Sequence, residues 1–158
     1  MEQKMFCFQC EQTAGGKGCT GCAGVCGKKA DTAQLQDDLT GALIILAHQA
    51  KEKQAQNAVI DKLIIEALFT TLTNVNFNNE TIQQMKQRIH AETLNIGGTI
   101  GDYDMNNIWN ADEDVRSLKS LILFGIRGVA AYAYHAEVLG YQDEAVAAFF
   151  YKALSALQ

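Results

Sequence analysis

The chain contains no proline, no cysteine after residue 26 and no long apolar run. Its five cysteines all lie between Cys7 and Cys26, within a chain of 158 residues. A disulfide scaffold usually spreads its cysteines along a short chain, because cross-links that close long loops stabilise most. The odd count and the clustering therefore argue against structural disulfides. No run of about 18 consecutive apolar residues occurs, which argues against a transmembrane helix.

Targeting signals and basic segments are also missing. No apolar signal segment precedes the cysteines, since the chain opens with the polar residues Glu2, Gln3 and Lys4. The net charge is −5, and Lys and Arg are not concentrated in any one segment, which argues against a nucleic-acid partner. With 48% apolar residues, the chain can bury a core without cross-links. We therefore expect a soluble cytoplasmic protein with reduced thiols and with no nucleic-acid or membrane partner.

After the cysteine loop, from Asp31 onward, the apolar residues follow a helical periodicity. Apolar residues recur every three or four positions, whereas the alternation typical of strands is scarce. Asp31 or Thr32 is expected to cap the first helix, and Gly140 to end the fourth. The pattern predicts an all-α fold of antiparallel helical bundles. The expected helices run from Asp31 to Ala50, from Asn57 to Leu72, from Glu80 to Leu94, from Asp112 to Leu139 and from Gln142 to Leu157.

The predicted organisation has four parts. Residues 1–30 form a Cys-rich loop, 31–95 a first helical bundle, 96–111 a connecting loop, and 112–158 a second helical segment of the same domain. The connecting loop is predicted from its glycines and asparagines. Gly125 and Gly128 lie inside the fourth helix, where each costs about 1 kcal/mol relative to alanine. We therefore expect another part of the chain to pack closely against them.

The cysteine spacing is compatible with more than one metal centre. Four thiolates can hold a 4Fe–4S cluster, a 2Fe–2S cluster or a single zinc or iron ion. Cys7-x2-Cys10 and Cys19-x2-Cys22 form two pairs typical of a zinc knuckle, but the separation between the pairs is shorter than usual. The bacterial ferredoxin spacing does not fit, because no proline follows. A third arrangement uses Cys7, Cys10, Cys19 and Cys26, and leaves Cys22 unused.

Charged residues near the cysteines give weaker indications. Glycines in the loop allow backbone N–H groups to turn toward sulfur. Lys17, Lys28 and Lys29 could offset the negative charge of a cluster, or could equally be solvated surface lysines.

The chain has three histidines, His48, His90 and His135. None has a glutamate three residues before it, so the Glu-x-x-His pattern of di-iron bundles is absent. We expect these histidines to be ordinary helix residues.

Several sequence blocks carry a family resemblance. FCFQCEQTA, GCT, VCGK and ADTAQLQDDL follow one another in the first 40 residues, and DEDVRSLKSLILFGIRGVAAYAYHAEVLGY lies near the end of the chain. In this order they resemble the hybrid-cluster proteins, also called the prismane or hydroxylamine reductase family. The resemblance extends over essentially all 158 residues.

The resemblance implies a ligand set and a role. It implies that Cys7, Cys10, Cys19 and Cys26 ligate the proximal iron–sulfur cluster, with 4Fe–4S favoured and 2Fe–2S as an alternative. The chain has six residues between the last two of these cysteines, where many members have five, which makes Cys22 an alternative ligand. No catalytic residue is expected in this chain.

The resemblance also implies absent parts. Family members continue into α/β domains that hold a hybrid iron–sulfur–oxygen cluster, where hydroxylamine is reduced. This chain is expected to correspond to the N-terminal electron-relay region, with a redox donor and those α/β domains, or a separate chain supplying them, as partners. The alternatives are a stand-alone iron–sulfur carrier or redox sensor, and a zinc-stabilised helical module.

Overall fold

The structure is a computed structural model that describes residues 5–10, 17–72 and 75–158. In these ranges it contains helices and no sheet, which confirms the predicted all-α fold class. Two isolated β-bridges lie in the cysteine loop. The helices are α1 (Ala30–Glu52), α2 (Ala58–Thr70), α3 (Asn79–Asn95), α4 (Asn106–Trp109), α5 (Glu113–Val138) and α6 (Glu144–Ser155).

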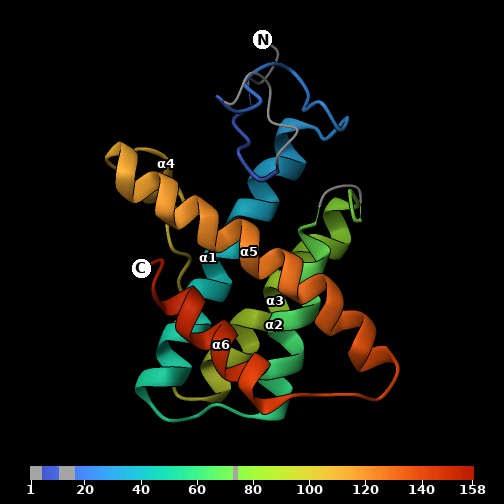
Figure 1. Ribbon diagram of the computed structural model, residues 1–158, viewed down its shortest axis with the longest axis vertical. Coiled ribbons are helices and arrows are strands. Elements are labelled where there is room, and N and C mark those ends of the chain that lie inside the picture. The colour runs from blue at the N-terminus through green and yellow to red at the C-terminus, as the bar shows by residue number, and fades with distance from the viewer. Residues whose placement is uncertain (1–4, 11–16, 73–74) are drawn as a thin grey trace.

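The helices form a bundle below the cysteine loop (Figure 1). Helix α1 leads away from the loop, α2 returns toward it and α3 leads away again, packed along α1. Helix α5 crosses in front and packs on α2, while α6 packs on α1. The first helix therefore joins the loop to the centre of the bundle.

The core is apolar and continuous, and within the described ranges it draws on every helix from α1 to α6. Its largest fully buried side chains, apart from Tyr151 and Phe150 of α6, are leucines and isoleucines at the inward positions of the helices. This burial explains why the three- and four-residue periodicity predicted the long helices correctly. The members from the first three helices include Leu39, Leu43, Leu46, Ile60, Ile64, Leu68, Ile82 and Ile89.

The helix starts differ in their capping. The Asn57 side chain accepts hydrogen bonds from the Val59 and Ile60 backbone nitrogens at the start of α2. Helix α1 begins one residue earlier than predicted, after Lys29, with no side-chain cap at that position. The prediction that Asp31 or Thr32 caps this helix is therefore wrong, because both residues already lie inside its first turn.

The end of α5 was predicted correctly. Gly140 follows the helix with a φ of +83°, which favours glycine. Its N–H donates to the Glu137 carbonyl at 2.9 Å, and the Tyr141 N–H donates to the Ala136 carbonyl at 2.9 Å. These two bonds form a Schellman motif that satisfies carbonyls at the helix end.

The segment 96–111, expected to be a loop, contains the one-turn helix α4. This segment also packs closely against a helix glycine, but that glycine is Gly41 of α1 and not Gly125 or Gly128 of α5. A Cβ atom at Gly41 of α1 would collide with the Tyr103 carbonyl oxygen, and the Tyr103 N–H donates to the Gly41 carbonyl at 3.1 Å. A Cβ at Gly125 or Gly128 would meet no described atom within 4 Å. The expectation of close packing at those two glycines is therefore wrong for the described part of the chain.

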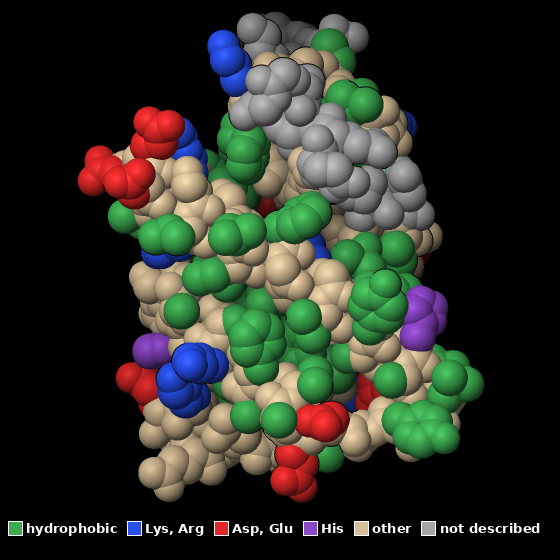
Figure 2. Space-filling model, in the orientation of Figure 1, with side chains coloured by type: hydrophobic (Ala, Val, Ile, Leu, Met, Phe, Trp, Pro, Cys, Tyr) green, Lys and Arg blue, Asp and Glu red, His purple; other side chains and the backbone are tan. Residues whose placement is uncertain are grey.

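The surface over α5 is partly hydrophobic (Figure 2). Leu118, Leu121 and Phe124 are exposed on this helix. None of the helices in the described ranges combines the length and hydropathy needed to cross a membrane. The division of the chain into four parts at residues 30, 95 and 111 stays a prediction.

Candidate metal centre in the cysteine loop

Two of the cysteines face each other across the loop. The Cys7 N–H donates to the Cys19 carbonyl at 3.0 Å, and the Cys19 N–H donates to the Cys7 carbonyl at 2.8 Å. The Met5 N–H extends this antiparallel pairing to Gly21 at 3.1 Å. Both cysteines are buried. The backbone therefore brings Cys7 and Cys19 together although eleven residues separate them in the sequence.

Cys26 lies in a second turn. Ala23 and Lys29 form a β-bridge at the base of this turn. Next to the bridge, the Gly24 N–H donates to the Lys28 carbonyl at 2.8 Å. The Cys26 sulfur lies 3.5 Å from the position of a Cβ on Gly24, so this glycine leaves room beside the thiol. Cys26 is half-buried.

The other two cysteines differ in exposure. Cys10 is half-buried and Cys22 is exposed. Among the described residues, no three His, Cys, Asp or Glu side chains lie close enough to hold a metal ion. The structure thus assembles the Cys7 and Cys19 pair. The complete set of Cys7, Cys10, Cys19 and Cys26, with Cys22 as the alternative, stays a prediction.

A buried lysine points at the first cysteine. The Lys28 Nζ lies 3.9 Å from the Cys7 Sγ and donates to the Gln9 Oε1 at 2.9 Å. Lys28 is only 3% exposed, whereas Lys17 and Lys29 are exposed. The cysteine-loop pattern did not distinguish these three lysines, but Lys28 alone of the three is buried, beside Cys7.

The cysteine loop is tied to α1 through Gln9. The Gln9 side-chain N–H donates to the Asp37 carboxylate at 2.5 Å. Burial raises the pKa of Asp37 to about 6, although the Gln9 bond, Arg127 and Lys28 each favour the ionised form. At neutral pH this carboxylate is therefore charged and buried.

Arg127 of α5 is the second buried cation at this junction. Its Nε donates to the Thr71 hydroxyl at 3.1 Å and its Nη2 to the Thr40 hydroxyl at 3.4 Å. Burial lowers the pKa of the Arg127 guanidinium, while Asp37 and the cysteines at 7 and 10 act in the opposite direction. A cavity of about 320 Å³ has Gln9, Cys10 and Arg127 in its wall.

The thiol of Cys7 responds to the same environment. Burial raises the pKa of Cys7, and the nearby Lys28 ammonium partly offsets this effect. A bound metal would deprotonate such a thiol, since thiolates are the ligating form. Lys28 is placed to neutralise part of the resulting charge.

Aromatic side chains cover one side of the loop. Phe6 and Phe8 each pack edge-on against Trp109 of α4, with ring centroids 6.0 Å and 6.1 Å apart. The Trp109 Nε1 is buried and makes no hydrogen bond of standard geometry within the described residues. The Trp109 indole also lowers the pKa of Asp37, which partly offsets the effect of burial. Trp109, in the 96–111 segment, therefore contacts the cysteine loop.

Three functional candidates were missed in the sequence. Gln9, Asp37 and Arg127 are polar residues at the buried junction. Two of them, Asp37 and Arg127, could have been identified from their positions on the helical pattern. Asp37 and Arg127 lie among inward-facing apolar positions of α1 and α5, where a solvated residue would be out of place.

The histidines lie outside this junction. His48 pairs with Glu52 at 3.2 Å and His90 with Asp102 at 2.7 Å, while His135 packs edge-on against Phe69. None belongs to a group of three metal-binding side chains in the part of the chain that the structure describes. Each histidine has a local structural partner.

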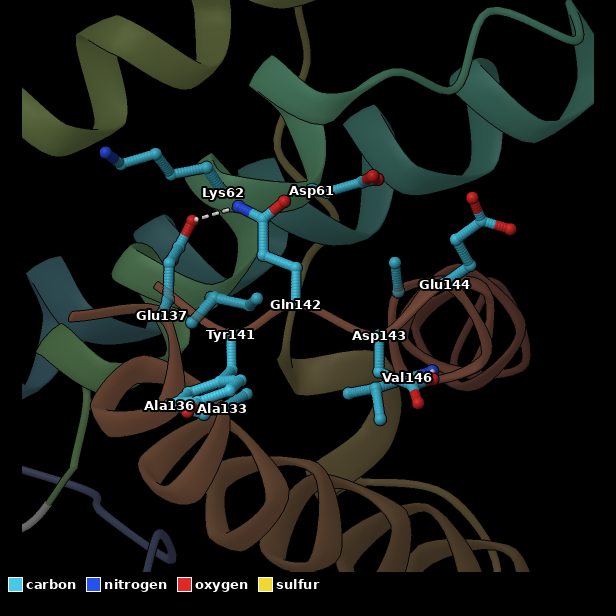
Figure 3. A pocket seen from close by; sticks show the side chains of 12 residues that line it. Asp61, Lys62, Ala133, Ala136, Glu137, Tyr141, Gln142, Asp143, Glu144 and Val146 are labelled. Carbon is cyan, nitrogen blue, oxygen red and sulfur yellow. Dashed lines mark hydrogen bonds between the residues drawn. The ribbon is translucent and has the colours of Figure 1, made fainter. Parts of the chain in front are cut away.

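A second cavity lies between α2, α5 and α6 (Figure 3). Its volume is about 330 Å³, and Gln142 donates to Glu137 in its wall at 3.1 Å. Acidic side chains surround it, including Asp61 and Glu144, but no cysteine lines it. It provides no soft ligand and is separate from the cysteine loop.

The donor set at the loop fits an iron–sulfur centre. Clustered cysteines offer soft thiolates, which such clusters require. The buried Lys28 and Arg127 supply positive charge on the side where a thiolate-bound cluster would be negative. With Cys7 as a metal ligand, Lys28 and Gln9 would orient its thiolate without binding the metal themselves.

Comparison with known proteins gives a consistent result. Residues 5–158 match the Prismane/CO dehydrogenase family. Similar proteins named hydroxylamine reductase occur in Methanocella arvoryzae (41% identical), Thermodesulfovibrio yellowstonii (42%) and Porphyromonas gingivalis strain W83 (39%). In each case the match covers 98% of this chain and 33–34% of the relative.

Two features of these matches concern length. The chain spans about a third of the length of the curated relatives it matches. The aligned region in Methanocella arvoryzae, 187 positions, is longer than the 158 residues of this chain. That relative therefore carries, within the matched region, residues that have no counterpart here.

Proposed function

The chain belongs to the Prismane/CO dehydrogenase family, and on that premise we propose that it is the N-terminal iron–sulfur electron-relay region of a hydroxylamine reductase. Membership in this family supports an iron–sulfur centre as the group that the thiols hold. The finer statement, a 4Fe–4S cluster on Cys7, Cys10, Cys19 and Cys26, is part of the proposal. The observation that carries it is the buried Cys7 and Cys19 pair with the Lys28 ammonium beside Cys7.

When bound, the cluster supplies a centre that accepts and donates one electron at a time. The residues of the chain do the rest. The paired backbone segments hold Cys7 and Cys19 in register, and Lys28 offsets ligand charge. Phe6 and Phe8 pack on Trp109 and place apolar surface on one side of the loop.

The proposed reaction lies in the parts that the longer relatives carry beyond this chain. Reduction of hydroxylamine to ammonia and water consumes two electrons and two protons, and it needs an open metal site. A cluster with four cysteine ligands leaves no such site. We therefore propose that this chain relays electrons from a redox donor, in a cytoplasmic setting, and does not by itself turn over hydroxylamine.

Anaerobic purification with iron and sulfide analysis tests the cofactor. Equal iron and sulfide with broad visible absorbance supports a 4Fe–4S or 2Fe–2S cluster, and electron paramagnetic resonance of the reduced protein distinguishes the two. A colourless protein that contains zinc instead would overturn the proposal in favour of a zinc-stabilised module. Turnover of hydroxylamine above that of free iron by these 158 residues would contradict the relay role.

A serine scan tests the ligands. Replacing Cys7, Cys10, Cys19 or Cys26 should abolish or convert the cluster, because each change removes a thiolate. The matched control, Cys22→Ser, should leave the iron content and spectrum nearly unchanged. Loss of iron in Cys22→Ser together with retention in Cys26→Ser would instead support two Cys-x2-Cys pairs.

A further inference from the structure

The buried charges of the molecule are concentrated at one place. In the ranges that the structure describes, the charged side chains that are buried are Lys28, Asp37 and Arg127. All three lie where the cysteine loop meets α1 and α5. Burying a charge is costly unless it is paired or hydrogen-bonded, so this concentration calls for a physical reason.

A chain of hydrogen bonds fixes the lysine. Lys28 donates to the Oε1 of Gln9 at 2.9 Å, and the Nε2 of Gln9 donates to Asp37 at 2.5 Å. The amide of Gln9 thus uses its acceptor for the lysine and its donor for the carboxylate. The Lys28 ammonium is held 3.9 Å from the Cys7 sulfur by a link anchored in α1.

The charges do not balance within this group. Lys28 and Arg127 bring two positive charges, and Asp37 brings one negative charge. Among the described residues, one positive charge is therefore left over at this junction, and Cys7 and Cys10 lie near Arg127. An anionic centre on the cysteine side would neutralise the excess, and a cluster held by four thiolates is such a centre.

We propose that Lys28, held by Gln9 and Asp37, is a positioning residue that raises the reduction potential of the cluster bound at the cysteine loop. The inference rests on the proposed function. Reduction adds one negative charge to the cluster, so a fixed cation beside the Cys7 sulfur stabilises the reduced form more than the oxidised form. A purely structural lysine would hold the loop in place without changing the potential of a fully loaded cluster.

The test compares Lys28→Met with Lys29→Met in the anaerobically loaded protein. Both variants remove one lysine charge, but Lys29 is exposed and its charge is screened by solvent. Lys28→Met should lower the reduction potential by about 59 mV, so that the ratio of reduced to oxidised cluster at a fixed potential falls about tenfold for one electron. Lys29→Met should change this ratio by less than about twofold. Iron and sulfide content and the circular dichroism of each variant show whether it is loaded and folded.

A second variant protects the test against a loading defect. Lys28→Gln removes the charge but keeps a donor for Gln9, and it should lower the potential to a similar extent. An unchanged potential in a loaded Lys28 variant, or an equal shift in Lys29→Met, would overturn the inference while leaving the proposed function intact. Failure of the unmodified chain to take up iron and sulfide would contradict the proposed function itself, and the inference with it.

Discussion

The helical bundle and the cysteine loop are stabilised by different interactions. The bundle has a continuous core of leucine and isoleucine side chains that are fully buried. The loop has a small separate cluster of Met5, Cys7, Cys19 and Ala33, together with backbone bridges and the polar links of Lys28. A region with its own apolar core can fold without a ligand, whereas a glycine-rich loop with buried charge needs one to become stable.

The largest effect should come from truncating the bundle core. Leu43 of α1 is fully buried, so Leu43→Ala should lower the free energy of unfolding by about 2–5 kcal/mol. The matched control, Leu121→Ala on exposed α5 surface, should change it by less than about 0.5 kcal/mol. Chemical denaturation of this chain measures both, and equal effects would show that the bundle does not depend on the core described above.

Two glycines inside helices should respond in opposite directions. Gly41→Ala should destabilise the chain by about 2 kcal/mol, because the new methyl group collides with the Tyr103 backbone. Gly125→Ala should stabilise it by about 1 kcal/mol, because the space is open and alanine favours a helix. Thermal unfolding of the two variants measures the difference. A stabilising Gly41→Ala would contradict the close approach of the 96–111 segment to α1.

The junction between the two regions should show a pH dependence. The folded-state pKa of Asp37 is raised to about 6, so its stabilising contribution is complete below its unfolded pKa and is lost as pH rises through about 6. The stability of the metal-free chain relative to Asp37→Asn should therefore increase by about 1 kcal/mol from pH 7 to pH 5. Denaturation at both pH values provides the measurement, and a decrease would contradict the burial of an ionised carboxylate.

The smallest effect on the bundle should come from removing the metal. Chelation should leave the far-ultraviolet circular dichroism nearly unchanged, because the helices bury their own apolar faces. Hydrogen exchange at the Cys7 and Cys19 amides should become faster in the metal-free protein, since these amides belong to the loop. Unfolding of the helices on chelation would show that the two regions are not independent.

The fold could be predicted further than the site. Apolar periodicity identified the long helices, because inward residues such as Leu43 and Leu68 recur at helical spacing. The one-turn helix α4 is too short to produce such a pattern. The close approach at Gly41 could not be predicted either, because its partner Tyr103 lies far away in the sequence.

The site was predicted through its cysteines but not through their surroundings. Clustering pointed to the five thiols, and the family resemblance proposed which four bind. Lys28 could not be distinguished from Lys29, since the difference in burial depends on the turn between Ala23 and Lys29. Asp37 and Arg127 come from helices remote in sequence and meet only in the folded chain.

The edge-on packing of Phe6 and Phe8 against Trp109 has a practical consequence. Trp109 is the single tryptophan of the chain, so all indole fluorescence comes from the contact between α4 and the cysteine loop. Its emission wavelength therefore reports whether the loop is docked on the bundle. A coloured metal centre in the loop would also quench this emission by energy transfer, which gives each loading experiment an optical signal without an added label.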